Sequence, residues 1–296
     1  MDIEENLMFG PNYNCDYRIH IADHHRSNSF CSIYDSTVSR FREKFNISKN
    51  KEVLILSGSG TQSIAVLFNS MNNPLSIRGI NGFFKQRLET LSYQRKEDLS
   101  LPVITCKVQY ETSASKLNDV NGIHFVDAVS SFPYYDIPDS TPVWLTVSSK
   151  LLGGLPVISI LVIDREFLFE NITNRGDLLG LWNVYVNSKK GQTPFTPQMG
   201  ALIDLNNRLE KFSISSLRNS IKNTCEFINN HVSSDFIIGE KVAPSIIIHR
   251  SYFDEKAIKM FNLYPSKIKD YVQVFTYSED FSAYEHLFVK KGKIFA

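Results

Sequence analysis

The sequence predicts an α/β fold: a mostly parallel central sheet flanked by helices, followed by a small C-terminal α+β domain. The first observation is that an apolar, strand-like run is repeatedly followed by an amphipathic segment, which is typical of βαβ units. In VLILSGSGTQSIAVLFNSM, Val53 to Leu56 is predicted as a buried strand and Gln62 to Met71 as a helix. The second observation is that polar residues directly follow several strand-like runs. In a parallel sheet such residues converge on one crevice.

The remaining elements follow from hydrophobic spacing. A helix is predicted over about residues 32–45, because Ile33, Val38, Phe41 and Phe45 recur at helical intervals. Helical structure is also expected within residues 177–190 and over a long amphipathic region, residues 199–231. Further strands are predicted at residues 101–108, 122–129, 143–147 and 155–164, and after Gly239 in PSIIIH and YVQVFTY.

This pattern divides the chain into three predicted parts. The first is an N-terminal segment, residues 1–31, which is too irregular and polar to form a core and is expected to lie across another surface. The large domain is predicted at residues 32–230 and the small C-terminal domain at residues 231–296.

Composition excludes several classes of protein. The 296 residues are 43% hydrophobic and 21% charged, with a net charge of +1, so neither nucleic acid nor an anionic membrane surface is an expected partner. The four cysteines form no C-x-x-C pair, which argues against structural zinc and a disulfide framework and favours a reducing cytoplasm. No signal peptide or membrane span is predicted, because the start is acidic and the apolar runs are short.

A glycine-rich turn, Ser57 to Thr61, separates the first strand from its helix. Unbonded N–H groups and the helix dipole make such a helix start a natural seat for phosphate. The turn lacks the G-K-[ST] of a P-loop and the G-x-G-x-x-G fingerprint. The alternative interpretation is an ordinary strand-to-helix turn.

A second informative stretch is VWLTVSSKLLGGLP, Val143 to Pro156. It places Lys150 after a buried strand, beside hydroxyl and glycine residues, where burial and nearby cations lower a lysine pKa and make the amine nucleophilic. The alternative is a surface lysine at a strand end. Asp127 ends another predicted strand and is a second candidate functional residue. The alternative interpretation is that it only caps a helix or a turn. His24, His25 and Arg26 are adjacent but have no third ligand in view, so no metal is expected.

Taken in order, these motifs resemble the class V aminotransferases among the fold-type I pyridoxal-phosphate enzymes. The similarity is to the alanine–glyoxylate, serine–glyoxylate and aminoethylphosphonate–pyruvate group and covers about residues 7–205. Each motif alone is weak, and their order is what makes the resemblance specific. The matching segments are FGPN and HHRSNSF, SGSGT, NGFFKQR, YETSAS, FVDAVSS, VSSKLLGGLP and QTPFTP.

The resemblance implies a cofactor and two catalytic residues. Lys150 forms a Schiff base with pyridoxal 5′-phosphate and afterwards moves a proton as general base and acid. Asp127 pairs with the pyridinium nitrogen and keeps the ring an electron sink. The expected activity is transfer of an amino group between a small amine or amino acid and a keto or aldehyde acceptor.

The resemblance also implies which residues surround the cofactor. Ser59, Gly60, Thr61 and Ser148 are expected at the phosphate, Phe84 and Val129 on the two ring faces, and Thr112 nearby. Thr196 is expected to reach the cofactor of a neighbouring subunit, so that a homodimer shares its active sites. The large domain forms the dimer interface, and the N-terminal segment brings Arg26 toward the substrate.

Two departures from the family pattern bear on function. The chain is shorter than these relatives usually are, and VNGI, residues 120–123, replaces a helical connection. The small domain lacks the family arginine that clamps a substrate carboxylate, and Arg250 lies elsewhere in that domain. A pyridoxal-phosphate lyase or desulfurase, or a lapsed enzyme that acts as a binding protein, therefore remains as an alternative.

Overall fold

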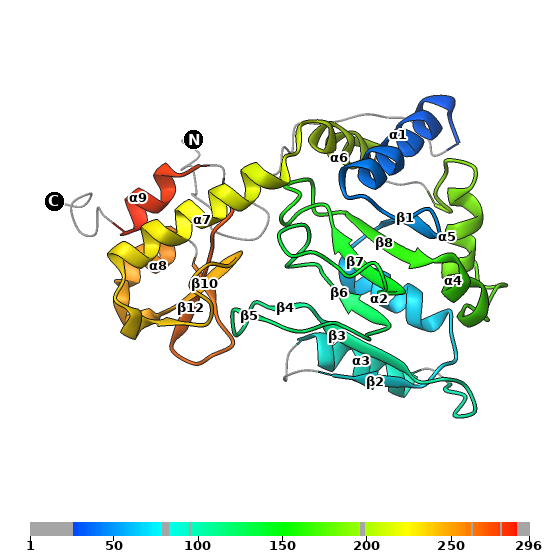
Figure 1. Ribbon diagram of the computed structural model, residues 1–296, viewed down its shortest axis with the longest axis horizontal. Coiled ribbons are helices and arrows are strands. Elements are labelled where there is room, and N and C mark those ends of the chain that lie inside the picture. Colours follow the sequence, from blue (N-terminus) through cyan, green and yellow to red (C-terminus); the bar gives the residue numbers. More distant parts are fainter. Residues whose placement is uncertain are drawn as a thin grey trace. The chain divides into compact units, whose positions relative to one another are not determined.

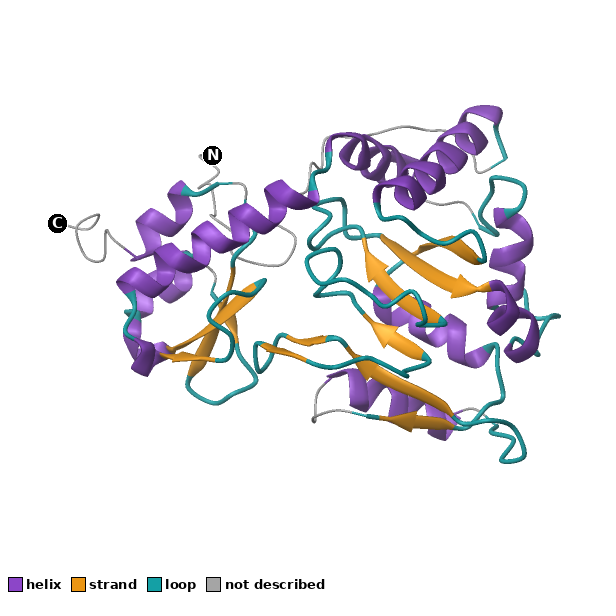
Figure 2. Ribbon diagram, viewed as in Figure 1, coloured by secondary structure: helices purple, strands orange, loops and turns teal. Residues whose placement is uncertain are grey.

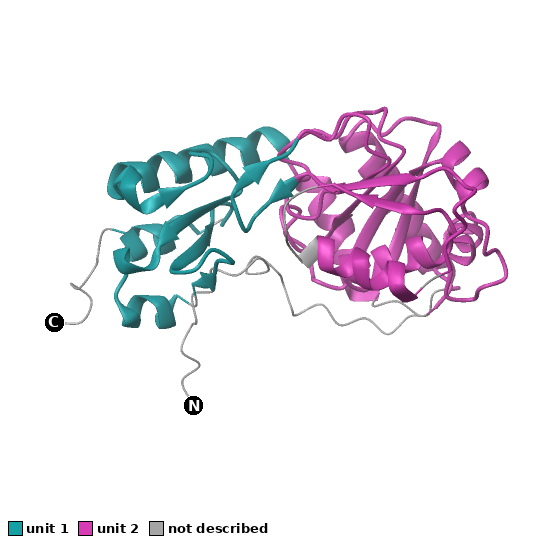
Figure 3. Ribbon diagram, turned by 90° about the horizontal axis from the view of Figure 1, so that it is seen from below, with its two compact units in different colours: residues 1–14, 110–118, 213–296 teal, residues 15–109, 119–212 magenta. Residues whose placement is uncertain are grey.

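The computed structural model describes residues 26–78, 83–94, 96–195, 199–261, 263–278 and 280–288, with only the backbone for residues 83 and 84. The chain forms two compact units (Figure 3). The large unit comprises residues 15–109 and 119–212. The small unit comprises residues 1–14, 110–118 and 213–296.

The large unit is built on a six-stranded sheet with the order β1-β8-β7-β6-β3-β2 (Figure 1). β7, β6, β3 and β2 are parallel neighbours, whereas β8 runs antiparallel to both β1 and β7. The predicted α/β fold with a mostly parallel sheet is confirmed. The strands are β1 (Lys51–Ser57), β2 (Leu75–Ile77), β3 (Ile104–Val108), β6 (Phe125–Asp127), β7 (Val143–Val147) and β8 (Ile158–Asp164).

Helices cover both faces of this sheet (Figure 2). Alternate residues of β1 serve the two faces: Val53 and Ile55 pack with α1 and α6, while Leu54 and Leu56 pack on the opposite side. Central strands buried on both faces are apolar throughout, which is why their sequences read as continuous apolar runs. One layer holds α1 (Asn28–Lys44) and α6 (Met199–Lys211), and the other holds α2 (Gly60–Asn69), α3 (Phe83–Gln94), α4 (Arg165–Asn171) and α5 (Leu181–Ser188).

Two consecutive parallel crossovers contain no α-helix. The connection from β3 to β6, residues 109–124, passes instead through a hairpin of β4 (Tyr110–Glu111) and β5 (Lys116–Leu117). The connection from β6 to β7, residues 128–142, consists of turns. The structure has no helix at VNGI, residues 120–123, and that this segment replaces a helical connection of the relatives stays a prediction.

The loop from β7 to β8 carries Lys150 and is fixed by internal hydrogen bonds. The N–H of Gly153 donates to the Lys150 carbonyl (2.9 Å), and Gly153 has a φ of 70°, the left-handed region that glycine adopts without steric cost. The carboxylate of Asp204, buried on α6, accepts from the N–H of Leu155 at 2.9 Å. These bonds hold the turn that begins at Lys150.

The small unit contains an antiparallel sheet with the order β11-β12-β10-β9. Antiparallel strands with helices outside the sheet confirm the predicted small α+β fold. Its strands are β9 (Ile237–Ile238), β10 (Ser245–His249), β11 (Tyr264–Pro265) and β12 (Tyr271–Phe275). Its helices are α7 (Ile214–His231), α8 (Glu255–Met260) and α9 (Ser282–Phe288), with short 3₁₀ turns η1 (Ser234–Phe236) and η2 (Arg250–Tyr252).

The units divide differently from the predicted domains at 32–230 and 231–296. The long helical region breaks after α6, where Ser213 caps α7 through a hydrogen bond from the N–H of Ser216. α7 belongs to the small unit, since the thiol of buried Cys225 donates to the Ala243 carbonyl and α7 packs against α9. The predicted N-terminal segment falls mostly on residues outside the described part, and its last residues lie in α1.

The hairpin of β4 and β5 also belongs to the small unit. The hydroxyls of Tyr110 and Ser115 donate to the Ser245 carbonyl, at 3.0 and 3.1 Å. The amide nitrogen of Gln273 donates to the Thr112 carbonyl at 3.0 Å. Because these polar groups are buried, the bonds that satisfy them bind the hairpin firmly to β10 and β12.

Among the helices of the described ranges, none combines the length and apolar character needed to cross a membrane. The described cysteines, Cys31, Cys106 and Cys225, are free thiols.

Gly153→Ala should lower the free energy of unfolding by about 1–2 kcal/mol, because an alanine Cβ disfavours the left-handed backbone of this turn. Gly176→Ala is the matched control: no heavy atom lies within 4 Å of the added Cβ, so its effect should stay within about 0.5 kcal/mol. Urea denaturation monitored by circular dichroism measures both. Equal losses in the two variants would contradict the assigned role of the Lys150 turn.

Candidate active site

Three chain segments meet at one edge of the large sheet. β6 and β7 are parallel, with Asp127 opposite Leu145, so the residues that follow both strands emerge at the same edge. The start of α2 reaches this edge too, because a Cβ added at Gly60 would lie 3.1 Å from Val129 Cγ2 and 3.5 Å from Val147 Cγ1. A side chain at position 60 would crowd Val129, so glycine permits this close approach.

The start of α2 offers unbonded backbone donors. Ser59 and Gln62 form a capping box: the Ser59 N–H donates to the Gln62 side-chain oxygen (2.8 Å), and the Gln62 N–H donates to Ser59 Oγ (3.3 Å). Within the described residues, the N–H groups of Gly60 and Thr61 donate to no protein acceptor. Two such donors and the helix dipole form a site suited to an anion.

Asp127 brings a carboxyl group into the protein interior. Its Oδ1 accepts from the Val129 N–H at 2.9 Å, which orients the carboxyl group at the end of β6. Burial raises the Asp127 pKa, and the Val129 N–H and the charges of Lys150 and Arg87 act in the opposite direction. Asp127 is only 9% exposed, so its charge interacts strongly with the few cations around it.

Lys150 lies close to Asp127 with its amine held in place. The amine donates to Ser130 Oγ at 2.6 Å, and Ser130 follows Asp127 in the turn after β6. Burial lowers the Lys150 pKa, Asp127 raises it, and the positive charge of Arg87 lowers it. The net lowering increases the fraction of neutral, nucleophilic amine at neutral pH.

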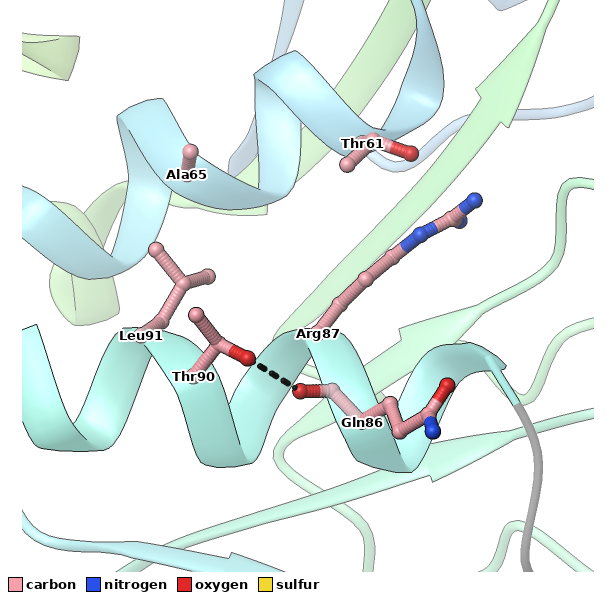
Figure 4. A pocket seen from close by; sticks show the side chains of 6 residues that line it. All are labelled: Thr61, Ala65, Gln86, Arg87, Thr90 and Leu91. Atoms are coloured by element: carbon pink, nitrogen blue, oxygen red, sulfur yellow. Dashed lines mark hydrogen bonds between the residues drawn. The ribbon is translucent and has the colours of Figure 1, made fainter.

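Arg87 is the member of this site that the sequence interpretation did not include. It comes from α3, beside a cavity of about 460 Å³ between α2 and α3 (Figure 4). The figure shows the Arg87 side chain extending toward Thr61 in the first turn of α2. The sequence clue was a cation three positions after Phe84, one turn along the same helix, within the motif NGFFKQR.

Two further residues predicted to surround the cofactor, Val129 and Ser148, lie at this edge and have contacts that the structure describes. Val129 packs against Gly60 in the first turn of α2, and its role at one face of the cofactor ring stays a prediction. The buried Ser148 hydroxyl contacts the carbonyl of Leu155 and lies 3.1 Å from that of Ile158. Ser148 is thus used to close the β7–β8 loop, and its role at a phosphate stays a prediction.

The other predicted residues are not placed beside Lys150 by the described structure. Phe84 belongs to α3, but its side chain lies outside the described part, as does the whole of Thr196. Thr112 belongs to the small unit, and Arg26 is exposed just before the N-cap of α1. His24 and His25, for which no metal was expected, also lie outside the described residues.

Arg250 forms an ion pair at the surface of the small unit. It lies in the 3₁₀ turn η2, and its guanidinium donates to both oxygens of Glu255, at 2.8 and 3.0 Å. This pairing neutralises its charge at the surface of the small unit.

No protein-family model matches the sequence, and no curated protein matches it either. Solved structures are similar. An alanine–glyoxylate aminotransferase from Nostoc sp. superposes with a TM-score of 0.79 at 14% identity, over 100% of this chain and 97% of that chain. A phosphoserine aminotransferase from Cytophaga hutchinsonii superposes with a TM-score of 0.76 at 17% identity, over 93% of this chain and 91% of that chain. A PLP-bound phosphoserine aminotransferase from Trichomonas vaginalis superposes with a TM-score of 0.66 at 13% identity, over 91% of this chain and 89% of that chain.

These similarities define the class of fold. The chain has the fold-type I architecture of pyridoxal-phosphate aminotransferases, and its structural neighbours are class V aminotransferases. The resemblance inferred from the ordered motifs is therefore confirmed at the level of fold.

Asp127→Asn should lower the pKa of Lys150 further, because it removes the negative charge that favours the protonated amine. The midpoint for reaction of Lys150 with an amine-directed acylating reagent should then move to lower pH, as measured by mass spectrometry of the peptide that contains Lys150. Asp119→Asn, which removes an exposed carboxylate, should leave the midpoint unchanged. An unchanged or higher midpoint in Asp127→Asn would show that the two groups are not coupled.

Proposed function

We propose that this protein is a pyridoxal-phosphate-dependent aminotransferase that uses Lys150 to bind its cofactor covalently. The observation that carries the proposal is the grouping of three features at one sheet edge. These are a lysine amine with a lowered pKa, a buried carboxyl group, and a helix start with two unbonded N–H groups. The architecture of known pyridoxal-phosphate aminotransferases supports the same assignment.

The residues fit the chemical groups of pyridoxal phosphate one by one. The neutral amine of Lys150 suits the aldehyde, the N–H groups of Gly60 and Thr61 suit the phosphate, and the Asp127 carboxylate suits the pyridine nitrogen. The cofactor, when bound, supplies an electron sink for charge that develops on the substrate carbon. Phe84, Val129, Thr112 and Ser148 are proposed as further contacts.

Lys150 is the proposed carrier of the proton that leaves the substrate carbon, and Ser130 orients its amine. The 2.6 Å hydrogen bond to Ser130 Oγ holds the amine in a defined direction. Once the substrate amine has replaced it on the cofactor, the freed Lys150 amine, with its lowered pKa, would accept a proton from the substrate carbon and return it at a neighbouring position. With the cofactor bound, an ionised Asp127 carboxylate would favour a protonated ring nitrogen.

The three cysteines in the described part of the chain favour an aminotransferase over a desulfurase. A desulfurase needs a reactive thiolate, and thiolates form where the thiol pKa is low and the sulfur is accessible. Cys106 is buried in β3, and burial raises the pKa of Cys225 to about 11. Cys31, on α1, is partly buried, with its sulfur 3.8 Å from the Gln192 amide.

We propose a small amine or amino acid as donor and a keto or aldehyde compound as acceptor, with Arg26 as a candidate contact for a substrate anion. A homodimer in the cytoplasm is proposed with them, with Thr196 of each subunit contacting the cofactor of the other. In such an assembly each active site needs both chains.

The cofactor assignment predicts a visible absorbance band in protein supplied with pyridoxal phosphate, which borohydride abolishes. After reduction, mass spectrometry should find the cofactor attached to the peptide containing Lys150. Lys150→Ala should lose both, whereas Lys190→Ala, at an exposed lysine of the same unit, should retain both. Wild-type protein that forms no such band would exclude every function that depends on this cofactor.

The reaction type predicts the products of half-reactions with a panel of amines. An aminotransferase converts its bound cofactor to pyridoxamine phosphate and releases the matching carbonyl compound. A lyase releases a smaller fragment and regenerates the starting cofactor. Fragmentation without pyridoxamine formation would reassign the protein to the lyases, and an inert complex would make it a lapsed, binding-only member.

A further inference from the structure

The cavity between α2 and α3 has one polar end and one apolar end. Ala65 and Leu91 form the apolar part, whereas Thr61 and Arg87 lie toward the first turn of α2 (Figure 4). The polar end therefore adjoins the unbonded N–H groups of Gly60 and Thr61. All the lining residues belong to the large unit: Thr61, Ala65, Gln86, Arg87, Thr90 and Leu91.

Two of the three hydroxyl groups expected at the phosphate, those of Ser59 and Ser148, are already used within the protein. Ser59 is the N-cap of α2, with its N–H and its Oγ both engaged in the capping box. Ser148 Oγ contacts backbone carbonyls of the β7–β8 loop. Two N–H groups and the Thr61 hydroxyl carry no net charge, so they neutralise little of a phosphate ester, whose charge is about −2 at pH 7.

We propose that Arg87 binds the phosphate group of the cofactor together with the N–H groups of Gly60 and Thr61. The proposal rests on the proposed function, since it concerns the same cofactor. A guanidinium presents several N–H donors in one plane and pairs with two phosphate oxygens at once. Arg87 reaches toward the first turn of α2 from a separate helix, so it meets the anion beside Thr61.

The electrostatics of the site agree with this position. The Arg87 charge lowers the pKa values of both Asp127 and Lys150, so the guanidinium lies within interaction range of both. Lys150 itself is proposed for the aldehyde, and Arg87 is a second cation at this site, within the described residues, that can serve the phosphate. A phosphate bound there would offset the Arg87 charge that lowers the Lys150 pKa.

The test compares two ligands that differ only in the phosphate. Equilibrium dissociation constants for pyridoxal phosphate and for pyridoxal are measured by absorbance titration with wild-type protein and Arg87→Gln. The variant should bind pyridoxal phosphate at least about ten-fold more weakly, because the loss of even one charge-assisted hydrogen bond has about this effect. Its affinity for pyridoxal should fall less, because on that ligand the loss of the Arg87 charge acts only through the Lys150 pKa. Arg87→Lys should recover part of both losses.

Lys85→Gln is the matched control, because it removes a positive charge from the same helix at a residue that does not line the cavity. It should leave both affinities at wild-type values, and thermal unfolding of each variant checks that the fold is intact. Equal weakening of both ligands, or no weakening, in Arg87→Gln overturns the proposal while leaving the cofactor assignment in place. Failure of wild-type protein to bind pyridoxal phosphate overturns both.

Discussion

The parallel pairing of β6 with β7 is the constraint on which the candidate site depends. It brings the end of β6, with Asp127, to the same sheet edge as the loop that carries Lys150. Burial alone favours the neutral forms of both Asp127 and Lys150. The opposite charge of each residue lowers the free-energy cost of keeping the other one charged. Removing either one leaves the other buried without its compensating charge. The short distance between Asp127 and Lys150 thus both stabilises their charges and brings the two groups together for chemistry.

Small residues and internal hydrogen bonds preserve that geometry. Gly60 lets α2 approach Val129 and Val147, and Gly153 closes the turn that begins at Lys150. The Asp204 carboxylate holds the far side of this turn through the Leu155 N–H. These features fix the backbone around Lys150, so the amine itself needs only one hydrogen bond, to Ser130, to be directed.

The connection from β3 to β6 ties one segment to the small unit. This connection contains no α-helix, and its hairpin is anchored on β10 and β12. Thr112, which the family resemblance associates with the cofactor, therefore belongs to the small unit and not to the unit whose sheet carries Lys150.

Sequence patterns predicted the strands of the large unit, because both-side burial makes them continuous apolar runs. They did not predict the antiparallel direction of β8, since apolar runs carry no direction, nor the place of α7, whose amphipathic pattern continues that of α6. The motifs identified Lys150, Asp127 and the turn before α2 as neighbours in space. They did not show that the N–H group of Ser59 is already bonded in a capping box, whereas the N–H groups of Gly60 and Thr61 are unbonded. Arg87 was missed because its role depends on how α3 faces α2, a tertiary relation with no spacing signature.

The most direct test of the central claim is a crystal structure of the protein grown with pyridoxal phosphate. The account predicts continuous electron density from Lys150 Nζ to the cofactor, its ring nitrogen at Asp127, and its phosphate at the N–H groups of Gly60 and Thr61. Density for the cofactor at another lysine, or a phosphate bound away from the first turn of α2, would contradict it.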